Sequence, residues 1–432
     1  MADSAETVIN PEMAWTLPVK VAYRIVFVYF ALYLFPFPFD HIPALSLIAV
    51  PWNMVIMPFI NWVSLAIFHI PPDSSNFSNG SGDQQLRYVE LAGYLGLAVI
   101  VAIPWSILDR KRKDYSRLFT FLRLWALLFV ASNMLSYGGC KVIPTQFPPV
   151  SESTLVERVG DLSPMGILWT FMGASRPYVI FTGSAELFAG LLLAIPSTAT
   201  LGALVAVAVS THIFMLNMCY DVPVKILSSH LLLLSVLFLL PEITNLVRFF
   251  VLRKATQPLP LPKLFRKKKL NEALQILSWI FLAYILIGSL YSSYYMKRHG
   301  FLHGSGAVKF GLWRVESALM RNFERDDGTF QPIPWQFVSN VYGEHIVVTT
   351  TNKQRYFRWK FSADGKTVDI TKNDDKEWHA HFDVDAPDAD TLNFVGKMNG
   401  EDCELKMSRQ NRSNFRLINR GFHWVNEYPF NM

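Results

Sequence analysis

The sequence is short of charge. Only 17% of its 432 residues are charged, while 51% are hydrophobic and 33 are Phe. This composition is too apolar and too aromatic for an ordinary soluble protein of this length. Several apolar runs reach about 20 residues, the length that crosses a bilayer core about 30 Å thick. The sequence therefore predicts an α-helical integral membrane protein.

Cysteine is also scarce, and no CxxC pair is present among the three cysteines. This excludes a zinc ribbon and a thioredoxin-type motif. The acidic N-terminus lacks the basic region of a cleaved signal peptide, so we expect the first apolar run to be a retained helix. The net charge of +6 is concentrated in short loops of the apolar part, which favours a role in topology and no nucleic-acid partner.

Seven membrane spans are expected, at about 19–37, 89–108, 119–137, 179–195, 201–219, 227–249 and 274–294. The segment 42–70 is rich in Trp, Met and Pro, and Pro51 and Pro58 are expected to break or kink a helix there. We interpret it as a broken helix that lies in the interface or packs on the bundle. A kinked additional span is the alternative.

Basic residues predict the topology. The loop 109–117 carries five basic and two acidic residues, and 248–269 carries eight basic residues and no acid. By the positive-inside rule both are cytoplasmic, which places the N-terminus inside and the C-terminal domain outside. The Lys267–Lys269 run is also expected to contact anionic lipid headgroups.

The expected domains follow from these spans. Residues 1–114 hold the N-terminal spans, 115–251 a four-helix bundle, 252–271 a basic linker, 272–296 the last span, and 306–432 an antiparallel β domain. The β domain is predicted from short runs at 344–351, 354–361, 378–384, 391–396, 403–407 and 414–417. Turn signals at Asp364-Gly365 and Asn399-Gly400 indicate a meander, which we expect to form an open barrel or a sandwich of six to eight strands.

Three ionisable residues fall on three successive predicted helices of the bundle: Glu186, His212 and His230. At 1.5 Å per residue, all three lie about 10 Å below the outer surface. An ionisable residue in a membrane helix is by default a candidate for a functional site. They either share one catalytic or binding site or are separate groups that are satisfied locally.

Further polar candidates lie in or just beyond the helices of the four-helix bundle: Asn133, Cys140, Lys141, Cys219, Asp221 and Lys225. Cys140 and Cys219 either pair as a redox couple or are unrelated buried thiols, and we expect Cys403 to point into the β-domain core. Asp221 and Lys225 are spaced for a helical ion pair. Lys141 is placed to reach Glu186. In the β domain, His379 and His381 alternate on one strand face, which is expected to be solvated and not a metal site.

Two motifs carry a family resemblance. Tyr137-Gly-Gly-Cys-Lys141 and Phe181-Thr-Gly-Ser-Ala-Glu186-Leu-Phe-Ala-Gly190-Leu-Leu-Leu resemble the DoxX/DoxD-like family of four-helix membrane proteins over about 115–250. The motif positions that match are Gly138, Lys141, Gly183, Glu186 and Gly190. The resemblance implies a bacterial inner-membrane protein linked to quinone-coupled sulfur oxidation or to thiol redox assemblies. His212 and His230 do not belong to the motif.

Three functions stay open. The first is a binding or scaffold component of a membrane assembly, with the β domain as the module that contacts a partner protein. The second is a quinone- or thiol-linked redox protein in which the polar cluster exchanges protons with a quinone headgroup. The third is a small-solute transporter, although no inverted repeat is evident in the sequence.

Overall fold

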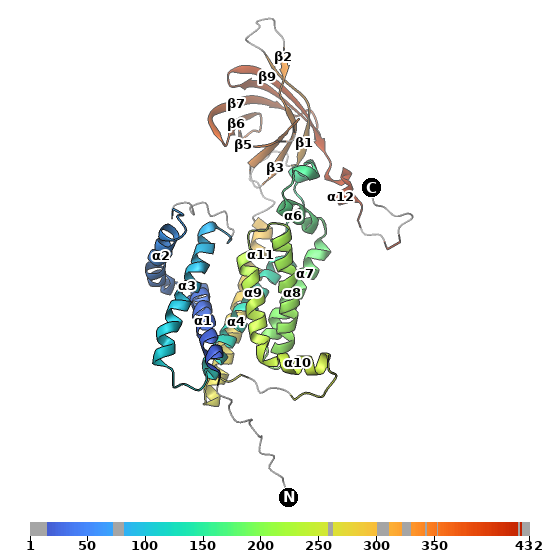
Figure 1. Cartoon of the computed structure of the whole chain (residues 1–432). Helices are drawn as coiled ribbons and strands as arrows, with labels where there is room; N and C mark the ends of the chain where they lie inside the picture. The colour runs from blue at the N-terminus through green and yellow to red at the C-terminus, as the bar shows by residue number, and fades with distance from the viewer. Residues whose placement is uncertain are drawn as a thin grey trace. The chain divides into compact units, whose positions relative to one another are not determined.

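The computed structural model describes residues 15–71, 82–257, 262–299, 311–321, 330–341, 344–351, 353–421 and 424–425. The chain forms two compact units, shown in Figure 1. Unit 1 comprises Met1–Gly139 and Gly183–Ser289, and unit 2 comprises Cys140–Thr182 and Leu290–Met432. Unit 1 is helical, whereas unit 2 contains all the described strands.

The helices that contribute to unit 1 are α1 (Leu17–Leu34), η1 (Phe39–His41), η2 (Ser46–Ile48), α2 (Ala49–Ala66), α3 (Gln85–Leu108), α4 (Ser116–Val142), α7 (Arg176–Ala194), α8 (Ala199–Cys219), α9 (Lys225–Leu239), η5 (Leu240–Glu242), α10 (Ile243–Phe250) and α11 (Lys268–His299). Within the described residues, eight helical segments are long and apolar enough to cross a membrane. Seven correspond to the predicted spans, and the eighth is Ser46–Ala66. By length and composition, these helices are compatible with a membrane protein.

The expectation of a broken helix at 42–70 was wrong, because α2 is continuous through Pro58. Pro51 is the third residue of α2, where its missing N–H would have no partner in the helix. Ile56, Ile60 and Val63 of α2 are buried against α3. Packing of this apolar face therefore outweighs the single hydrogen bond that Pro58 removes.

The segment 227–249, in contrast, is not one straight helix. The helix α9 ends at Leu239, Pro241 lies in the 3₁₀ turn η5, and α10 then runs crosswise to α9 (Figure 1). Proline lacks the N–H and its ring clashes with the preceding turn, so the helix axis changes direction here. The Arg123 side chain binds the backbone near the end of α9, since its Nε and Nη2 both donate to the Phe238 carbonyl.

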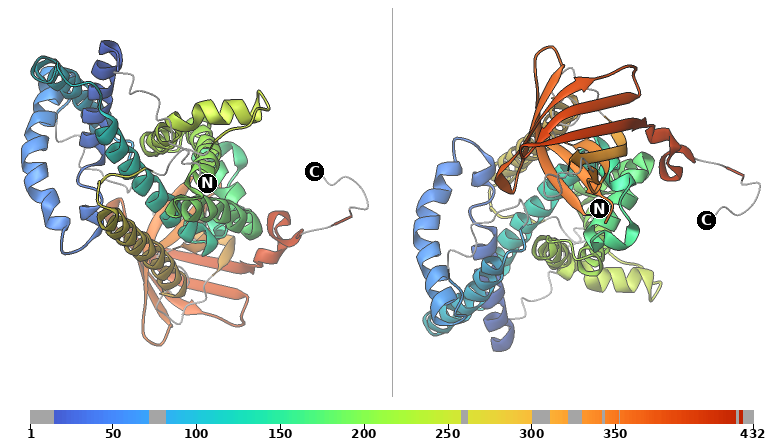
Figure 2. Two further views of the ribbon diagram at one scale, coloured as in Figure 1. Left: turned by 90° about the horizontal axis from the view of Figure 1, so that it is seen from below. Right: turned by 90° about the horizontal axis from the view of Figure 1, so that it is seen from above.

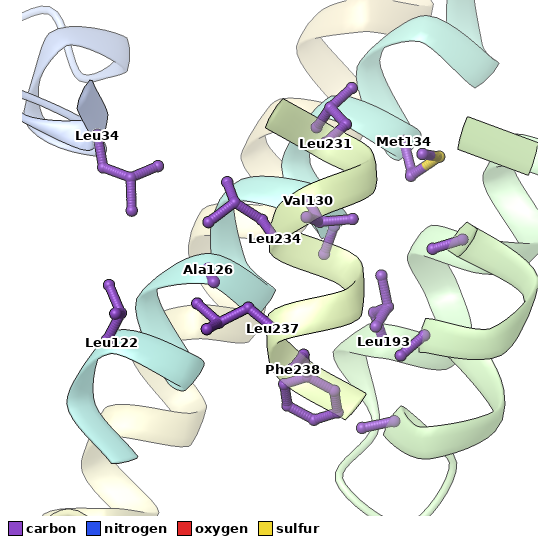
Figure 3. Close-up of a cluster of buried hydrophobic side chains, with 14 of the residues drawn as sticks. Leu34, Leu122, Ala126, Val130, Met134, Leu193, Leu231, Leu234, Leu237 and Phe238 are labelled. Atoms are coloured by element: carbon purple, nitrogen blue, oxygen red, sulfur yellow. The ribbon is translucent and has the colours of Figure 1, made fainter. Parts of the chain in front are cut away.

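The core of unit 1 is built around α4. Figure 3 shows Leu122, Ala126, Val130 and Met134, one helical turn apart, packed with side chains of α9 such as Leu234. This spacing of four residues gives α4 one continuous apolar stripe. The stripe lies against the other helices of the bundle and sets the positions of the polar groups described below.

Unit 2 contains an antiparallel β-barrel. Its strands are β1 (Leu312–Arg321), β2 (Phe330–Pro332), β3 (Trp335–Val341), β4 (Glu344–Thr349), β5 (Gln354–Phe361), β6 (Thr367–Lys372), β7 (Asp375–Asp385), β8 (Thr391–Met398) and β9 (Glu401–Gln410). Each strand from β3 to β8 pairs with the next, and β1 pairs with both β3 and β9. Eight strands therefore form a closed barrel, visible in Figure 2, and the short β2 extends it along β1.

Closure corrects the prediction of an open barrel or a sandwich, while the antiparallel meander is confirmed. The predicted strand at 414–417 was wrong, because the 3₁₀ turn Arg412–Asn414 and the helix α12 (Arg416–Asn419) occupy this region. The turn at Asn399-Gly400 is confirmed: both residues have positive φ, as a two-residue hairpin turn requires. Large apolar side chains, among them Phe382 and Phe394, fill the barrel interior.

The segment between α4 and α7 belongs to unit 2 as well. It forms α5 (Glu152–Leu155), η4 (Val159–Asp161) and α6 (Pro164–Ala174), and α5 packs against β3. The Arg412 guanidinium donates to Glu152 over 3.0 Å and to the Val150 carbonyl, and Gln354 Nε2 donates to Glu157 over 2.8 Å. Polar side chains thus join this segment to the barrel.

Candidate functional site

Glu186 and Lys141 are both buried. Glu186 is only 2% exposed and lies on the same face of α7 as Gly183 and Gly190. Lys141, at the end of α4, is 7% exposed. Burial of an ionisable group is costly unless it is satisfied, so both remain candidates for functional residues.

The motif glycines allow α4 and α7 to pack closely. A Cβ atom at Gly138 would lie 2.9 Å from the Gly183 carbonyl oxygen and 2.8 Å from Cγ of Leu187. A Cβ atom at Gly190 would lie 2.8 Å from Cγ of Leu135. A side chain at either position would force the two helices apart, so the glycine spacing of the motif has a direct structural cause.

His230 is buried in α9 and its ring is fully engaged. Its Nδ1 lies 2.7 Å from the Ile226 carbonyl oxygen, which accepts only, so Nδ1 carries a proton. Its Nε2 lies 2.7 Å from the Tyr29 hydroxyl, which donates to it when the imidazole is neutral. The Tyr33 ring stacks on the imidazole at a centroid distance of 3.8 Å. His230 therefore ties α9 to α1.

His212 does not accompany His230 into the core. Its side chain is exposed on α8, whereas Glu186 and His230 are buried. Of the two alternatives, one shared site or three separate groups, the exposure of His212 favours separate groups, because equal depth along the helices does not make side chains face one another. A shared site of all three is therefore not what the structure presents.

The three cysteines are thiols in the structure. Cys219 is exposed, Cys140 is half-buried and Cys403 is buried in the barrel. The interpretation of Cys140 and Cys219 as two buried thiols was wrong for Cys219, and the structure joins them by no disulfide. The prediction that Cys403 points into the core of its own domain is confirmed.

The ion pair predicted between Asp221 and Lys225 is confirmed, with 2.7 Å between Oδ1 and Nζ. Asp221 is 82% exposed, so this pair adds little stability. A second aspartate, which sequence reasoning missed, has a larger role. The Asp83 carboxylate accepts from the backbone N–H groups of Lys225 and Ile226 and so caps the N-terminus of α9.

Arg24 was also missed, although an arginine inside the first apolar run was a visible signal. It is fully buried in α1; its Nε donates to the Tyr115 hydroxyl over 3.0 Å and its Nη1 donates to Ser106 over 2.6 Å. The Tyr115 hydroxyl donates in turn to Asp109 over 3.0 Å. This chain connects the buried cation to a carboxylate, which offsets its desolvation.

Asn133, a candidate site residue from the sequence, lines a cavity. A cavity of about 230 Å³ is lined by His41, Ser132, Asn133, Ser136, Tyr284, Ile285, Gly288 and Ser289. These residues come from η1, α4 and α11. The Ser289 hydroxyl donates to the Ser136 carbonyl over 2.7 Å and so joins α11 to α4 beside the cavity.

The cavity lining is polar but carries no fixed charge. Asn133 Nδ2 and the Ser132 hydroxyl both donate to the Phe129 carbonyl, which leaves Asn133 Oδ1 as an acceptor. Nδ1 of His41 lies 2.8 Å from the Asp40 carboxylate, so Nδ1 carries a proton. Hydroxyl, amide and imidazole groups together offer both donors and acceptors to a neutral molecule.

The two histidines of β7 lie on the barrel surface. His379 is exposed, and Nδ1 of the exposed His381 lies 2.6 Å from Asp369. In the part of the chain that the structure describes, no cluster of three or more His, Cys, Asp or Glu is arranged to hold a metal ion.

Comparison with known proteins finds similarity to a bacterial protein. The chain is 37% identical over 112 residues to the uncharacterized protein YwoB of Bacillus subtilis, a match that covers 26% of this chain and 71% of YwoB. No family model matches the chain, and no solved structure matches it at a significant level.

Proposed function

We propose that this chain, which belongs to the family of the Bacillus subtilis protein YwoB, is a membrane-embedded binding protein that holds the polar headgroup of a small lipid-soluble molecule. The observation that carries the proposal is the cavity at Asn133 between η1, α4 and α11. Binding, and not chemistry on the bound molecule, is the function that its lining fits.

The size of the cavity restricts the ligand. At about 230 Å³ it lies below the roughly 300–1,000 Å³ of sites that enclose drug-sized ligands. A headgroup fits such a space, while an apolar chain stays along the helices. The exposed apolar side chains of α11, such as Ile280 and Ile287, offer a surface for that chain.

The chemistry of the lining restricts the ligand further. Among the residues that line the cavity, neither a carboxylate nor a Lys or Arg is present, so a charged headgroup would lack a counterion. Asn133 Oδ1 accepts a hydrogen bond, and the hydroxyl groups of Ser136 and Tyr284 donate or accept. Carbonyl and hydroxyl headgroups fit this set, and a quinone headgroup belongs to the same class.

The buried groups away from the cavity support a binding role over a redox role. Both ring nitrogens of His230 are hydrogen-bonded within the protein, so the imidazole ties helices together and does not wait for a substrate. Cys219 is exposed and forms no disulfide, which offers no support for a redox couple with Cys140. The proposal therefore treats Glu186, Lys141 and His230 as groups that position the helices.

The proposal includes a location in the cell membrane, with the N-terminus in the cytoplasm and the β-barrel outside. It rests on the eight apolar helices and on the basic segments 109–117 and 248–269. The DoxX/DoxD-like resemblance of residues 115–250 is part of the same proposal, and a partner protein would reach the barrel from outside.

The test is the content of small molecules in the purified protein. Wild-type protein and the variants Asn133→Leu and Ser136→Val are extracted with organic solvent, and the released molecules are identified by mass spectrometry. Loss of a hydrogen bond to a bound ligand costs roughly 1–3 kcal/mol of binding free energy. The ligand content of the variants should therefore be at least about tenfold lower than that of the wild-type protein.

The matched controls carry the same substitutions away from the cavity. Asn217→Leu changes a buried asparagine in α8, and Ser235→Val changes a buried serine in α9. These proteins should retain the ligand at the wild-type level. Equal ligand content in all five proteins, or no small molecule in any of them, would contradict the proposal.

A further inference from the structure

The short helix α10 exposes an apolar face. Ile243, Val247, Phe250 and Val251 follow the spacing of one helical face, and all four are exposed. Phe250 is 66% exposed and Val251 is 70% exposed. The opposite face carries Asn245 and Arg248, so the helix is strongly amphipathic.

The bundle itself holds α10 in place. Leu246 packs against the core of unit 1, and the turn at Pro241 directs the helix crosswise to α9 (Figure 1). The chain after α10 folds back on it: Lys254 N–H donates to the Arg248 carbonyl over 2.9 Å, and Asn245 Nδ2 donates to the Gln257 carbonyl over 3.0 Å. The apolar face is therefore a built surface and not a frayed helix end.

Basic residues lie next to the apolar face of α10. Arg248 lies in the last turn of α10, and Arg253 and Lys254 follow directly. Continuing to residue 269, the segment holds eight basic residues and no acidic one: Arg248, Arg253, Lys254, Lys263, Arg266, Lys267, Lys268 and Lys269. An apolar helix face bordered by cations matches a bilayer surface with anionic headgroups, because the face enters the acyl boundary and the cations meet the phosphates.

We propose that α10 lies flat on the membrane surface, with Ile243, Val247 and Phe250 in the acyl boundary and Arg253 and Lys254 against anionic lipid headgroups. The occupant of this surface is the anionic leaflet of the bilayer that contains the protein. Charge complementarity favours it over a second copy of the chain, whose own α10 region would present the same positive charge.

The test is hydrogen exchange of the full chain in lipid nanodiscs, measured by mass spectrometry on peptides that cover residues 243–254. One set of nanodiscs contains phosphatidylcholine alone, and the other contains phosphatidylcholine mixed with phosphatidylglycerol. We expect severalfold slower exchange of these amides in the mixed nanodiscs. The double variant Arg253→Gln/Lys254→Gln should lose this difference.

The control is Arg110→Gln/Lys111→Gln, which removes two positive charges from the loop 109–117 and should leave the difference intact. Exchange rates that are equal in the two lipid mixtures would overturn the proposal. Protection that rises with protein concentration in detergent would also overturn it, because a second copy would then cover the face.

Discussion

The Tyr29 hydroxyl lies 2.7 Å from Nε2 of His230, and the Ile226 carbonyl accepts from Nδ1 of the same ring. Residues 29 and 230 thus join α1 to α9. A buried polar pair of this kind adds specificity to helix packing, and each partner depends on the other.

This pair predicts a large coupling energy. Tyr29→Phe leaves a buried Nε2 without its donor, and His230→Phe leaves a buried hydroxyl without its acceptor, so each should lower the free energy of unfolding by about 1–3 kcal/mol. The double variant should be clearly more stable than the sum of the single effects implies. Thermal unfolding of all four proteins in detergent measures the cycle, and strictly additive effects would refute the pairing.

The two aspartates near the start of α9 should differ in their effect on stability. Asp83→Ala removes a cap that accepts two backbone N–H groups and should cost about 0.5–2 kcal/mol. Asp221→Ala removes only an exposed partner of Lys225 and should cost well below about 1 kcal/mol. Thermal unfolding of the two variants provides the comparison, and a larger loss for Asp221→Ala would show that the cap is unimportant.

Substitution by alanine should have opposite effects on stability at two helix glycines, Gly138 in α4 and Gly96 in α3. Gly138→Ala places Cβ 2.9 Å from the Gly183 carbonyl oxygen, so α4 and α7 must separate at a cost of about 1–3 kcal/mol. At Gly96 in α3 no atom lies within 4 Å of such a Cβ, and the better helix propensity of alanine should add up to about 1 kcal/mol. Unfolding of the two variants in detergent tests this difference in sign.

The barrel should lose stability in acid through His345. Burial lowers the pKa of His345 to about 4, below its value of 6.5 in a free chain. The unfolded chain therefore binds a proton that the folded barrel rejects, so stability falls as the pH drops from about 6.5 to 4, by up to about 3 kcal/mol. His345→Phe, which preserves an aromatic ring beside Trp359, should remove this part of the pH dependence.

The measurement uses the buried Cys403 as its reporter. The full-length protein is incubated in urea at pH 7 or pH 5 and then labelled in a brief alkylation pulse at one fixed pH. Wild-type protein should expose Cys403 at lower urea in acid, and the variant should shift less. The same shift in both proteins would assign the acid sensitivity to another group.

Local signals explain what was predictable from the sequence. Apolar runs located the long helices, and Asn399-Gly400 located a hairpin, because each signal lies within the element that it describes. Closure of the barrel depends on pairing Leu312 with Gln410, almost 100 residues apart, and no local pattern encodes it. Pro58 is a local signal that predicted a broken helix, but α2 is continuous there because its tertiary packing outweighs the local effect of proline.

The candidate site was predictable only in part for the same reason. Asn133 was identified as a polar residue in an apolar helix, whereas the cavity beside it also requires His41 and Gly288 from distant segments. The sequence gives the depth of a residue along its helix but not the direction in which its side chain points. The exposed His212 was therefore grouped with the buried Glu186. The sequence shows Arg24 as a charged residue in an apolar run, but its hydrogen-bond partners Ser106 and Tyr115 come close only in the tertiary fold.

An experimental density map of the purified protein in a lipid nanodisc tests the central claim most directly. The account predicts non-protein density in the cavity bounded by Asn133, Ser136 and Tyr284, within hydrogen-bond distance of Asn133 Oδ1, and its loss in Asn133→Leu. A wild-type cavity that is closed by its own side chains, or that contains only ordered water, would contradict the account.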